Sequence, residues 1–289
     1  MDYLVHLAII VCIYLILAQS FNLTFGLGGL FNLAHVAVYA IGAYTTALLS
    51  TELGQGFWVC IAASTSLSAL FALIIGAISL KLTHDYFAIG TLAFSAVVSA
   101  LLINWKSLTR GVLGIPGIPR PELFGIDFYE NRNFLVLISI FVVVTFVILH
   151  LFFSSRFARR LRMQSEHEPA THALAVSITA IRRDSFIVSS AFAGLAGSFF
   201  AYYINYIDPS SFGLHEMVFI LSIVIVGRPS SFWGVTLATF FLVLLPEPLR
   251  FIDINPSILG PMRQLLYSLI LFAVVYWKRE KLFPVQRTL

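Results

Sequence analysis

Long apolar runs alternate with short polar segments along most of the chain, and several runs reach membrane-spanning length without an Asp, Glu, Lys or Arg. About 20 mostly apolar residues cross the hydrocarbon core of a bilayer as a helix, so these runs predict transmembrane helices. They cover residues 3–25, 30–50, 57–80, 86–104, 134–153, 185–207, 217–233, 235–249 and 264–277. We therefore expect an all-α integral membrane protein, a polytopic bundle of about nine (8–10) transmembrane helices that forms a single domain over residues 1–289.

Composition supports this class, because only 11% of the residues are charged and the mean hydropathy is +0.91. Soluble domains carry roughly 25% charged residues, which excludes a water-soluble fold. The first ten residues, MDYLVHLAII, lack the basic region and small-residue cleavage site of a signal peptide, so we expect the first helix to be retained. Cys12 and Cys60 have neither pairing nor metal-ligand spacing around them, and no metal site is predicted.

Positive charges predict which segments face the cytoplasm, because Lys and Arg are retained on that side. Six arginines lie between residues 154 and 184, and the C-terminal segment is also basic. Both segments are expected inside, and counting spans back from them places the N-terminus and the loop at 105–133 outside. This topology and attraction to anionic lipid explain the net charge of +4 without a nucleic-acid partner.

The predicted spans contain no carboxylate away from their ends, and Glu247, between Pro246 and Pro248, comes nearest. An ion-coupled carrier usually keeps such a group to hold its coupling ion, so that class is disfavoured, as is a membrane hydrolase. The chain also has no G-x-x-x-x-G-K-[ST] motif for binding a nucleotide. If ATP drives transport, the motor must be another subunit.

The most polar stretch, RRLRMQSEHEPATHALAV at 159–176, separates apolar runs. Pro169 suits the first position of a helix, and the run that follows to residue 176 predicts a short helix with Ala170, Ala173 and Leu174 on one face. Seven or eight helical residues would form a rod of roughly 10 to 12 Å. Such a segment could dock a motor subunit or could be an ordinary solvated loop with basic anchors, and periodicity does not separate the two.

This stretch resembles the coupling loop of ABC importer permeases of the branched-chain amino acid type, whose pattern is approximately R-x-x-R-E-x-E-x-A-A-x-A-L-G. Five further blocks are similar to that family in the same order. They are NLTFGLGGLFNLAHVAVYAIGAYTTALL (22–49), DYFAIGTLAFSAVV (85–98), LTRGVLGIPGIPRPELFG (108–125), SSAFAGLAGSFFAYYINYIDPSSF (189–212) and GRPSSFWGVTLATFFLVLLPEPLR (227–250). Two departures occur: Arg110 stands where the family has Gly, and Arg228-Pro229 stands in place of Gly-x-Gly.

The resemblance implies the permease subunit of an ABC importer in a bacterial inner membrane, which moves a branched-chain or other amino acid inward by alternating access. It implies no cofactor on this chain, with ATP and Mg²⁺ bound by two partner ABC ATPase subunits. A second homologous permease, membrane lipid and a periplasmic or lipid-anchored substrate-binding protein, received by the loop at 105–133, complete the expected assembly. The expected coupling loop is 154–184, with the ATPase-coupling residues Arg162, Glu166, Glu168, Ala170, His172, Ala173 and Leu174.

Glycines predict helix packing and helix interruption. Gly194 and Gly197 have the small-residue spacing that lets helix backbones approach closely. Two further groups interrupt apolar runs and predict either broken helices near a gate or tight turns between helices. These groups are Gly26, Gly28 and Gly29 in the first half, and Gly227 and Gly234 in the second.

Polar residues of the first two spans are candidates for a substrate pathway. Asn32, His35 and Tyr39 are three and four residues apart, which places them on one helical face that should point into the bundle. They could instead hydrogen-bond a neighbouring helix. The pathway candidates are Asn22, Asn32, His35, Tyr39 and Tyr44.

Other functions remain compatible with these patterns. A passive channel would conduct without ATP, and a structural membrane subunit would not transport at all. Within the family, urea or a short amide is an alternative substrate to an amino acid.

Overall fold

The computed structural model describes residues 2–79, 84–123, 126–174, 177–247 and 256–282. The longer helices are α1 (Asp2–Phe21), α2 (His35–Thr51), α3 (Phe57–Ser79), α4 (His84–Asn104), α6 (Asn131–Ser154), α9 (Ile178–Ile204), α10 (Leu214–Val226), α11 (Phe232–Leu244) and α12 (Pro256–Leu282). The shorter elements are η1 (Asn22–Leu27), α5 (Lys106–Thr109), η2 (Gly111–Leu113), β1 (Ile115–Pro116), β2 (Glu122–Leu123), β3 (Ile126–Asp127), α7 (Arg156–Glu166), α8 (Glu168–Ala173), β4 (Tyr206–Ile207) and η3 (Pro209–Phe212). Apart from the two-residue strands, the regular structure of these ranges is helical, which confirms the all-α class.

The number of membrane crossings differs from the expectation. Each predicted span overlaps a helix, but within the described ranges only five helices are both long and apolar enough to cross a membrane. They are Asp2–Leu27, Phe57–Ala77, Tyr86–Asn104, Asn131–Ser154 and Ile178–Ile204. Helices α10 and α11 have 13 residues each, about 20 Å of helix, which is less than the roughly 30 Å of hydrocarbon. The count of about nine is therefore not confirmed, and residues 248–249 of the eighth predicted span lie outside the described residues.

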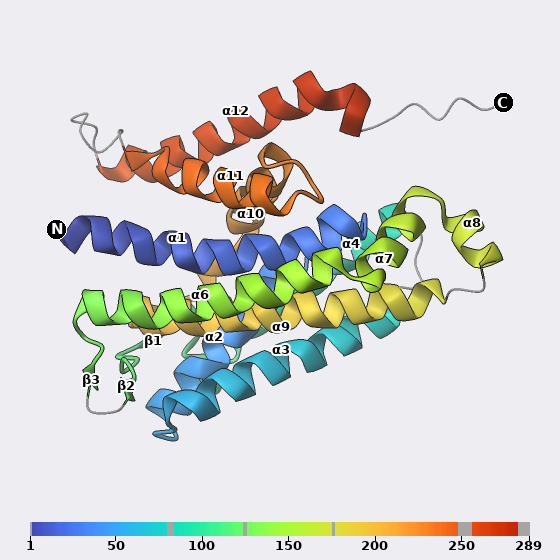
Figure 1. The fold of residues 1–289 in the computed structure, drawn as a ribbon. Helices are drawn as coiled ribbons and strands as arrows, with labels where there is room; N and C mark the ends of the chain where they lie inside the picture. The colour runs from blue at the N-terminus through green and yellow to red at the C-terminus, as the bar shows by residue number, and fades with distance from the viewer. Residues whose placement is uncertain (1, 80–83, 124–125, 175–176, 248–255, 283–289) are drawn as a thin grey trace.

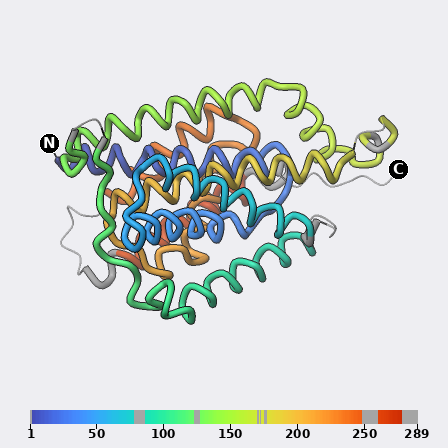
Figure 2. The backbone as a smooth tube through the Cα atoms, turned by 90° about the horizontal axis from the view of Figure 1, so that it is seen from below, coloured from blue at the N-terminus to red at the C-terminus, as the bar shows by residue number. Residues whose placement is uncertain are grey.

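Helices α1 and α9 form the centre of the bundle. Helix α9 packs against α2 and α3, α1 packs against α6, α9 and α11, and α10 packs against α12. The most apolar part of α9 is 67% buried and that of α1 is 61% buried, whereas that of α4 is only 22% buried. Seen from below, α4 and α6 lie at opposite edges, with α1 and α9 between them (Figure 2). The outer helices therefore present most of their apolar surface outward, as expected for contact with lipid.

The loops divide between the two ends of the bundle. The N-terminal end of α1 lies at the same end as β1, β2 and β3, while α7 and α8 lie at the other (Figure 1). This arrangement agrees with the predicted topology, in which the N-terminus and the loop at 105–133 share the side opposite to 154–184. The predicted assignment of these sides to the outside and the cytoplasm is not fixed by the arrangement itself.

Three glycines occupy the places where α2, α3 and α9 come closest. A Cβ added to Gly197 would lie 2.2 Å from the carbonyl oxygen of Tyr39, and one added to Gly42 would lie 2.4 Å from that of Gly194. On the other side of α9, a Cβ on Gly194 would lie 2.8 Å from the carbonyl oxygen of Ser64. Lipid tails are as apolar as leucine, so helices in a membrane associate through such close packing and through hydrogen bonds.

Buried hydroxyl groups join the same three helices. Ser198 of α9 forms hydrogen bonds with Ser64 of α3 and with Thr46 of α2, the latter at 2.5 Å. Ser68 of α3 also donates to the carbonyl oxygen of Val38 in α2, at 3.3 Å. The three helices thus form one unit that is held by backbone contact and by polar side chains.

Replacing Gly197 with Val tests this crossing. The added side chain meets backbone atoms of α2, which cannot move aside as a flexible side chain would, and we expect a loss of stability of about 3 kcal/mol or more. The measurement is the thermal unfolding temperature of the purified protein in mild detergent. Gly56→Val is the control, because no atom lies within 4 Å of a Cβ at that position. Equal unfolding temperatures for the two variants would contradict the role assigned to Gly197.

Candidate functional site

The loop between α6 and α9 folds into two consecutive helices, α7 and α8. The Ser155 side chain caps α7 by accepting a hydrogen bond from the Ala158 amide at 3.2 Å, which satisfies a backbone donor that would otherwise be free. Ala158, Leu161 and Gln164 are buried, at a spacing of three residues along one face. The remaining surface is exposed and basic. Its arginines are Arg156, Arg159, Arg160 and Arg162.

Helix α8 corresponds to the predicted short helix but is shorter and begins earlier. It covers Glu168–Ala173, six residues or about 9 Å, so the expectation of seven or eight residues over 170–176 was wrong. Pro169 is its second residue, still within the first turn where a missing amide is tolerated. Residues 175–176 lie outside the described residues, as do the side chains of Ala170 and His172. Ala173 and Leu174 are exposed, and 63% of Leu174 is accessible.

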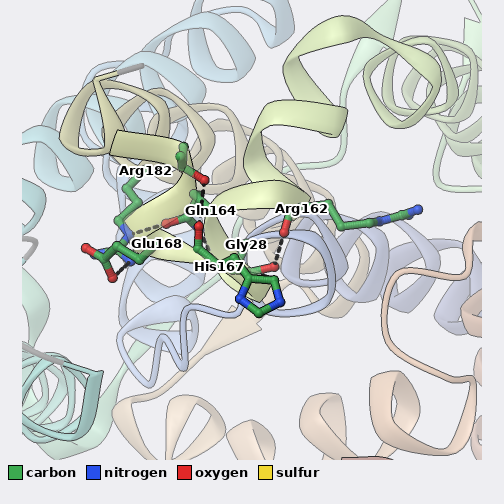
Figure 3. Close-up of polar contacts among 8 residues, drawn as sticks. Gly28, Arg162, Gln164, His167, Glu168 and Arg182 are labelled. Atoms are coloured by element: carbon green, nitrogen blue, oxygen red, sulfur yellow. Dashed lines mark hydrogen bonds and ion pairs between the residues drawn. The ribbon is translucent and has the colours of Figure 1, made fainter. Parts of the chain in front are cut away.

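A buried polar network connects α8 to the first helix through α7 and α9 (Figure 3). Arg182 of α9 donates to Glu168 Oε2 at 2.9 Å and to Gln164 Oε1 at 2.6 Å. Gln164 in turn donates to the carbonyl oxygen of Gly28 at 2.8 Å. Arg182 is only 9% exposed and Gln164 only 1%, so little water competes for the bonds of Gln164, whereas the Glu168 side chain is 37% exposed. Glu168 balances the charge of Arg182, and the hydrogen bond to Gln164 fixes the orientation of its guanidinium group.

A second contact joins α7 to the same part of the chain. Ser165 Oγ lies 3.2 Å from the carbonyl oxygen of Leu27. A Cβ on Gly29 would lie 3.1 Å from Cβ of Ser165, and one on Gly28 would lie 2.6 Å from the carbonyl oxygen of Thr24. Gly29 also has a positive φ of 64°. The predicted hinge or packing glycines Gly28 and Gly29 therefore lie directly under α7.

The two glycine-rich interruptions contact each other. The first is η1, a π-helix that continues α1, and the second is the turn between α10 and α11. Asn22 Oδ1 accepts from the Ser230 amide at 3.1 Å, and Ser230 Oγ donates to the carbonyl oxygen of Gly26 at 2.5 Å. A Cβ on Gly26 would lie 2.6 Å from the Ser230 nitrogen. The sequence left open whether these sites are broken helices or tight turns. In the structure each lies between two helices, the first as a π-helical end of α1 that leads to α2 and the second as the turn between α10 and α11.

Within the second interruption, Gly227 and Gly234 allow α10 and α11 to meet. A Cβ on Gly234 would lie 2.0 Å from the carbonyl oxygen of Gly227. Between them, Arg228 and Ser230 have left-handed backbones, with φ of 70° and 68°. Arg110, the other departure from the family pattern, has a φ of 59°. The family's Gly at Arg110 and Gly-x-Gly at 228–230 coincide with these conformations, which glycine adopts without strain.

The polar candidates in the membrane interior are buried but do not form one helical face. Asn32 precedes α2, because that helix begins at His35, and Asn32 Oδ1 instead accepts from the Ala34 amide at 3.0 Å. The expectation of a shared helical face for Asn32, His35 and Tyr39 was therefore wrong at its first member. Four of the five candidates carry a buried polar atom without a hydrogen-bond partner in the described structure. These atoms are Asn32 Nδ2, His35 Nδ1, Tyr39 Oη and Tyr44 Oη.

The loop at 105–133 is tethered to the end of α9 at the opposite end of the bundle. Strand β1 pairs with β4, and Arg120 donates to the carbonyl oxygens of Tyr129 at 2.9 Å and Tyr203 at 3.2 Å. The Arg120 guanidinium also lies 5.4 Å and 5.2 Å from the ring centres of Phe134 and Tyr203. Desolvation lowers the pKa of Arg120, although Tyr203 opposes the shift, and the group remains charged at neutral pH. The described part of this loop is therefore held against the bundle.

Comparison with known proteins identifies the family. Residues 3–275 match the family of the permease component of branched-chain amino acid transport systems. The high-affinity branched-chain amino acid transport system permease proteins LivM of Salmonella typhimurium and Escherichia coli are each 34% identical to this chain, over 98% of it and 70% of their own length. The chain belongs to this permease family.

A more distant relative is also named as a branched-chain amino acid transport permease. The probable branched-chain amino acid transport permease protein LivM of Methanocaldococcus jannaschii is 27% identical, over 93% of this chain and 80% of its own. No solved structure gives a significant match. As a member of this permease family, the chain is a multi-pass membrane transport subunit rather than a catalytic one.

Sequence reasoning missed two residues of the network that joins α8 to Gly28 in this permease. Gln164 could have been found from the spacing of Ala158, Leu161 and Gln164, which places an amide on an otherwise apolar helix face. No sequence pattern distinguishes Arg182 from the neighbouring Arg183. Only the fold shows that Arg182 is buried and Arg183 is exposed.

Substitution of Gln164 tests the network. Gln164→Ala leaves the Arg182 Nε and the Gly28 carbonyl unpaired in a buried site, and we expect a loss of stability of about 2 kcal/mol or more. Gln164→Glu retains an acceptor for Arg182 and loses only the donor to Gly28, so its unfolding temperature in detergent should fall less. The exposed Gln55→Ala is the control. An unfolding temperature for Gln164→Ala equal to that of the control would rule out a structural role of the network.

Proposed function

We propose that this permease is the membrane subunit of an ATP-binding-cassette importer that moves a branched-chain or other amino acid into a bacterial cell. The family assignment and the names of its relatives support the substrate class. Two ATPase subunits that bind ATP and Mg²⁺ would supply energy, and a second permease of the same family would complete the membrane part. An external binding protein would deliver substrate at the end of the bundle that carries the loop at 105–133.

The observation that supports this mechanism best is the continuous contact from α8 to η1, the π-helical end of the first helix. Movement of α8 displaces Glu168, and the bonds from Glu168 through Arg182 and Gln164 reach Gly28. From there η1 is bonded to the turn between α10 and α11. A force applied to the predicted coupling loop would therefore reach both interruptions of the membrane helices. Alternating access requires such an element to have different contacts in two states.

We further propose that α10 and α11 form a re-entrant pair. Their joining turn contacts η1, near the end of the first helix that lies close to α7. Neither helix is long enough to cross the hydrocarbon alone, so these two predicted spans would form one pair and not two crossings. Exchanging two crossings for one pair leaves the predicted sides of the N-terminus and of the C-terminus unchanged.

The coupling role is tested by Leu174→Asp. An unpaired charge placed in an interface costs several kcal/mol, so we expect ATP-driven leucine uptake by the reconstituted importer to fall about tenfold or more, together with stimulated ATPase activity. Leu53→Asp is a matched control, because Leu53 is also 63% exposed but lies between α2 and α3. Uptake unaffected by Leu174→Asp would show that α8 is not the coupling element.

The same preparation separates the importer from its alternatives. Uptake that continues after ATP depletion would establish a passive channel instead. ATP-driven uptake of urea or a short amide, without uptake of leucine, would retain the importer and change its substrate. Absence of any uptake by an intact assembly would favour a structural subunit.

A further inference from the structure

A cavity of about 610 Å³ lies between α1, α10, the end of α11 and the start of α12. Its volume falls within the roughly 300 to 1,000 Å³ of small-molecule sites. None of its lining residues was a predicted pathway residue. The polar groups that line it include His6, Tyr14, Glu216, Glu247, Arg263 and Tyr267.

The cavity extends inward from the end of the bundle where substrate would be delivered. His6 Nδ1 lies 2.5 Å from Tyr203 Oη, and Arg120 of the loop at 105–133 contacts the same tyrosine. Tyr14, also in the wall, is eight residues further along α1, about 12 Å deeper. The wall therefore reaches from the loop end toward the middle of the first helix, and transporter binding sites are typically found near this depth.

The cavity brings together charges of opposite sign. Tyr14 donates to Glu216 Oε1 at 2.7 Å, which fixes the position of that carboxylate. Arg263 lies across the cavity on α12, and its buried Nε has no hydrogen-bond partner in the described structure. Glu216 and Arg263 both act electrostatically on Tyr267. Ionisable groups inside a membrane protein are costly and usually serve a function.

A metal ion does not fit this arrangement. Among the described residues, no three His, Cys, Asp or Glu side chains come close enough together to hold one. An arginine and a carboxylate facing one cavity instead suit a ligand that carries both charges. Arginine binds carboxylates through paired hydrogen bonds, and a carboxylate pairs with an ammonium group.

We propose that this cavity binds the head group of an α-amino acid, with Arg263 pairing with the α-carboxylate and Glu216 with the α-ammonium group. This assignment rests on the proposed function, and it adds a substrate site within the permease itself. Glu216 lies in the first turn of α10 and Arg263 lies in α12, so the two groups face the cavity from different helices. The backbone amides at the start of α10 add positive potential that stabilises the ionised carboxylate of Glu216.

The rest of the wall fits an aliphatic side chain. Leu7, Ile10, Phe219 and Val243 line the cavity beside the charged groups. The ring centre of Phe219 lies 5.0 Å from that of Tyr14 and 4.3 Å from that of Tyr267, which fixes the apolar surface next to Glu216. Leucine, isoleucine and valine each combine a charged α-amino acid head group with an aliphatic side chain, and these two parts match the charged and the apolar parts of the wall.

Binding of radiolabelled leucine to the purified importer, without its binding protein, tests the site. We expect saturable binding that Arg263→Gln and Glu216→Gln each weaken more than about tenfold, because each leaves one buried charge of the ligand unpaired. Arg132→Gln and Glu130→Gln make the same chemical changes at exposed positions at the loop end and should bind leucine normally. Binding by the cavity variants equal to that of these controls would overturn the proposal.

Competition with leucine methyl ester distinguishes recognition from a structural role. The ester lacks the negative charge that Arg263 would bind, so it should compete poorly in the unmodified importer. In Arg263→Gln the affinities for leucine and for the ester should become more similar, because the contact that favours leucine is lost. Distortion of the site would instead weaken the binding of both compounds by the same factor. A preserved difference in Arg263→Gln would overturn the role of that residue, as would absence of leucine binding to an importer that takes up leucine with ATP. Failure of ATP-driven uptake, with leucine binding intact, would instead count against the proposed function.

Discussion

Close contact between helix backbones around α9 is the constraint on which the bundle depends. Inside a membrane there is little hydrophobic force to bring helices together, and here the absence of side chains at Gly42, Gly194 and Gly197 allows α2 and α3 to meet α9 directly. The hydroxyl of Ser198 then joins all three helices. With α2, α3 and α9 joined in this way, α4 and α6 lie at opposite edges of the bundle (Figure 2).

Irregular backbone also lies where the two halves of the chain meet. The π-helix η1 and the turn between α10 and α11 exchange hydrogen bonds through Asn22, Gly26 and Ser230. Arg228 and Ser230 hold left-handed conformations that cost a residue with a side chain more than they cost glycine. The side chains of these two residues therefore restrict the backbone of the turn more than glycines would.

The sequence predicted much of the fold because apolar length and glycine spacing are local properties. It could not predict that α10 and α11 stop after 13 residues each, since their turn is held by Asn22, 208 positions before Ser230. Asn32 was misplaced for a similar reason, because its side chain bonds the Ala34 amide and closes a turn before α2. The candidate site was located by its polar loop, but Gln164 and the cavity between α1 and α12 become visible only when distant elements pack together.

Helix α9 contacts the loops at both ends of the bundle. It carries Arg182 near its start, and Asn205, just after its end, holds the carbonyl of Ile118 in the opposite loop. Its 27 residues form a rod of about 40 Å. One inserted residue would lengthen that rod by about 1.5 Å and rotate one end by about 100° relative to the other. The helix should therefore resist insertions and deletions along its whole length, so that its residue count is as constrained as the identity of any side chain in it.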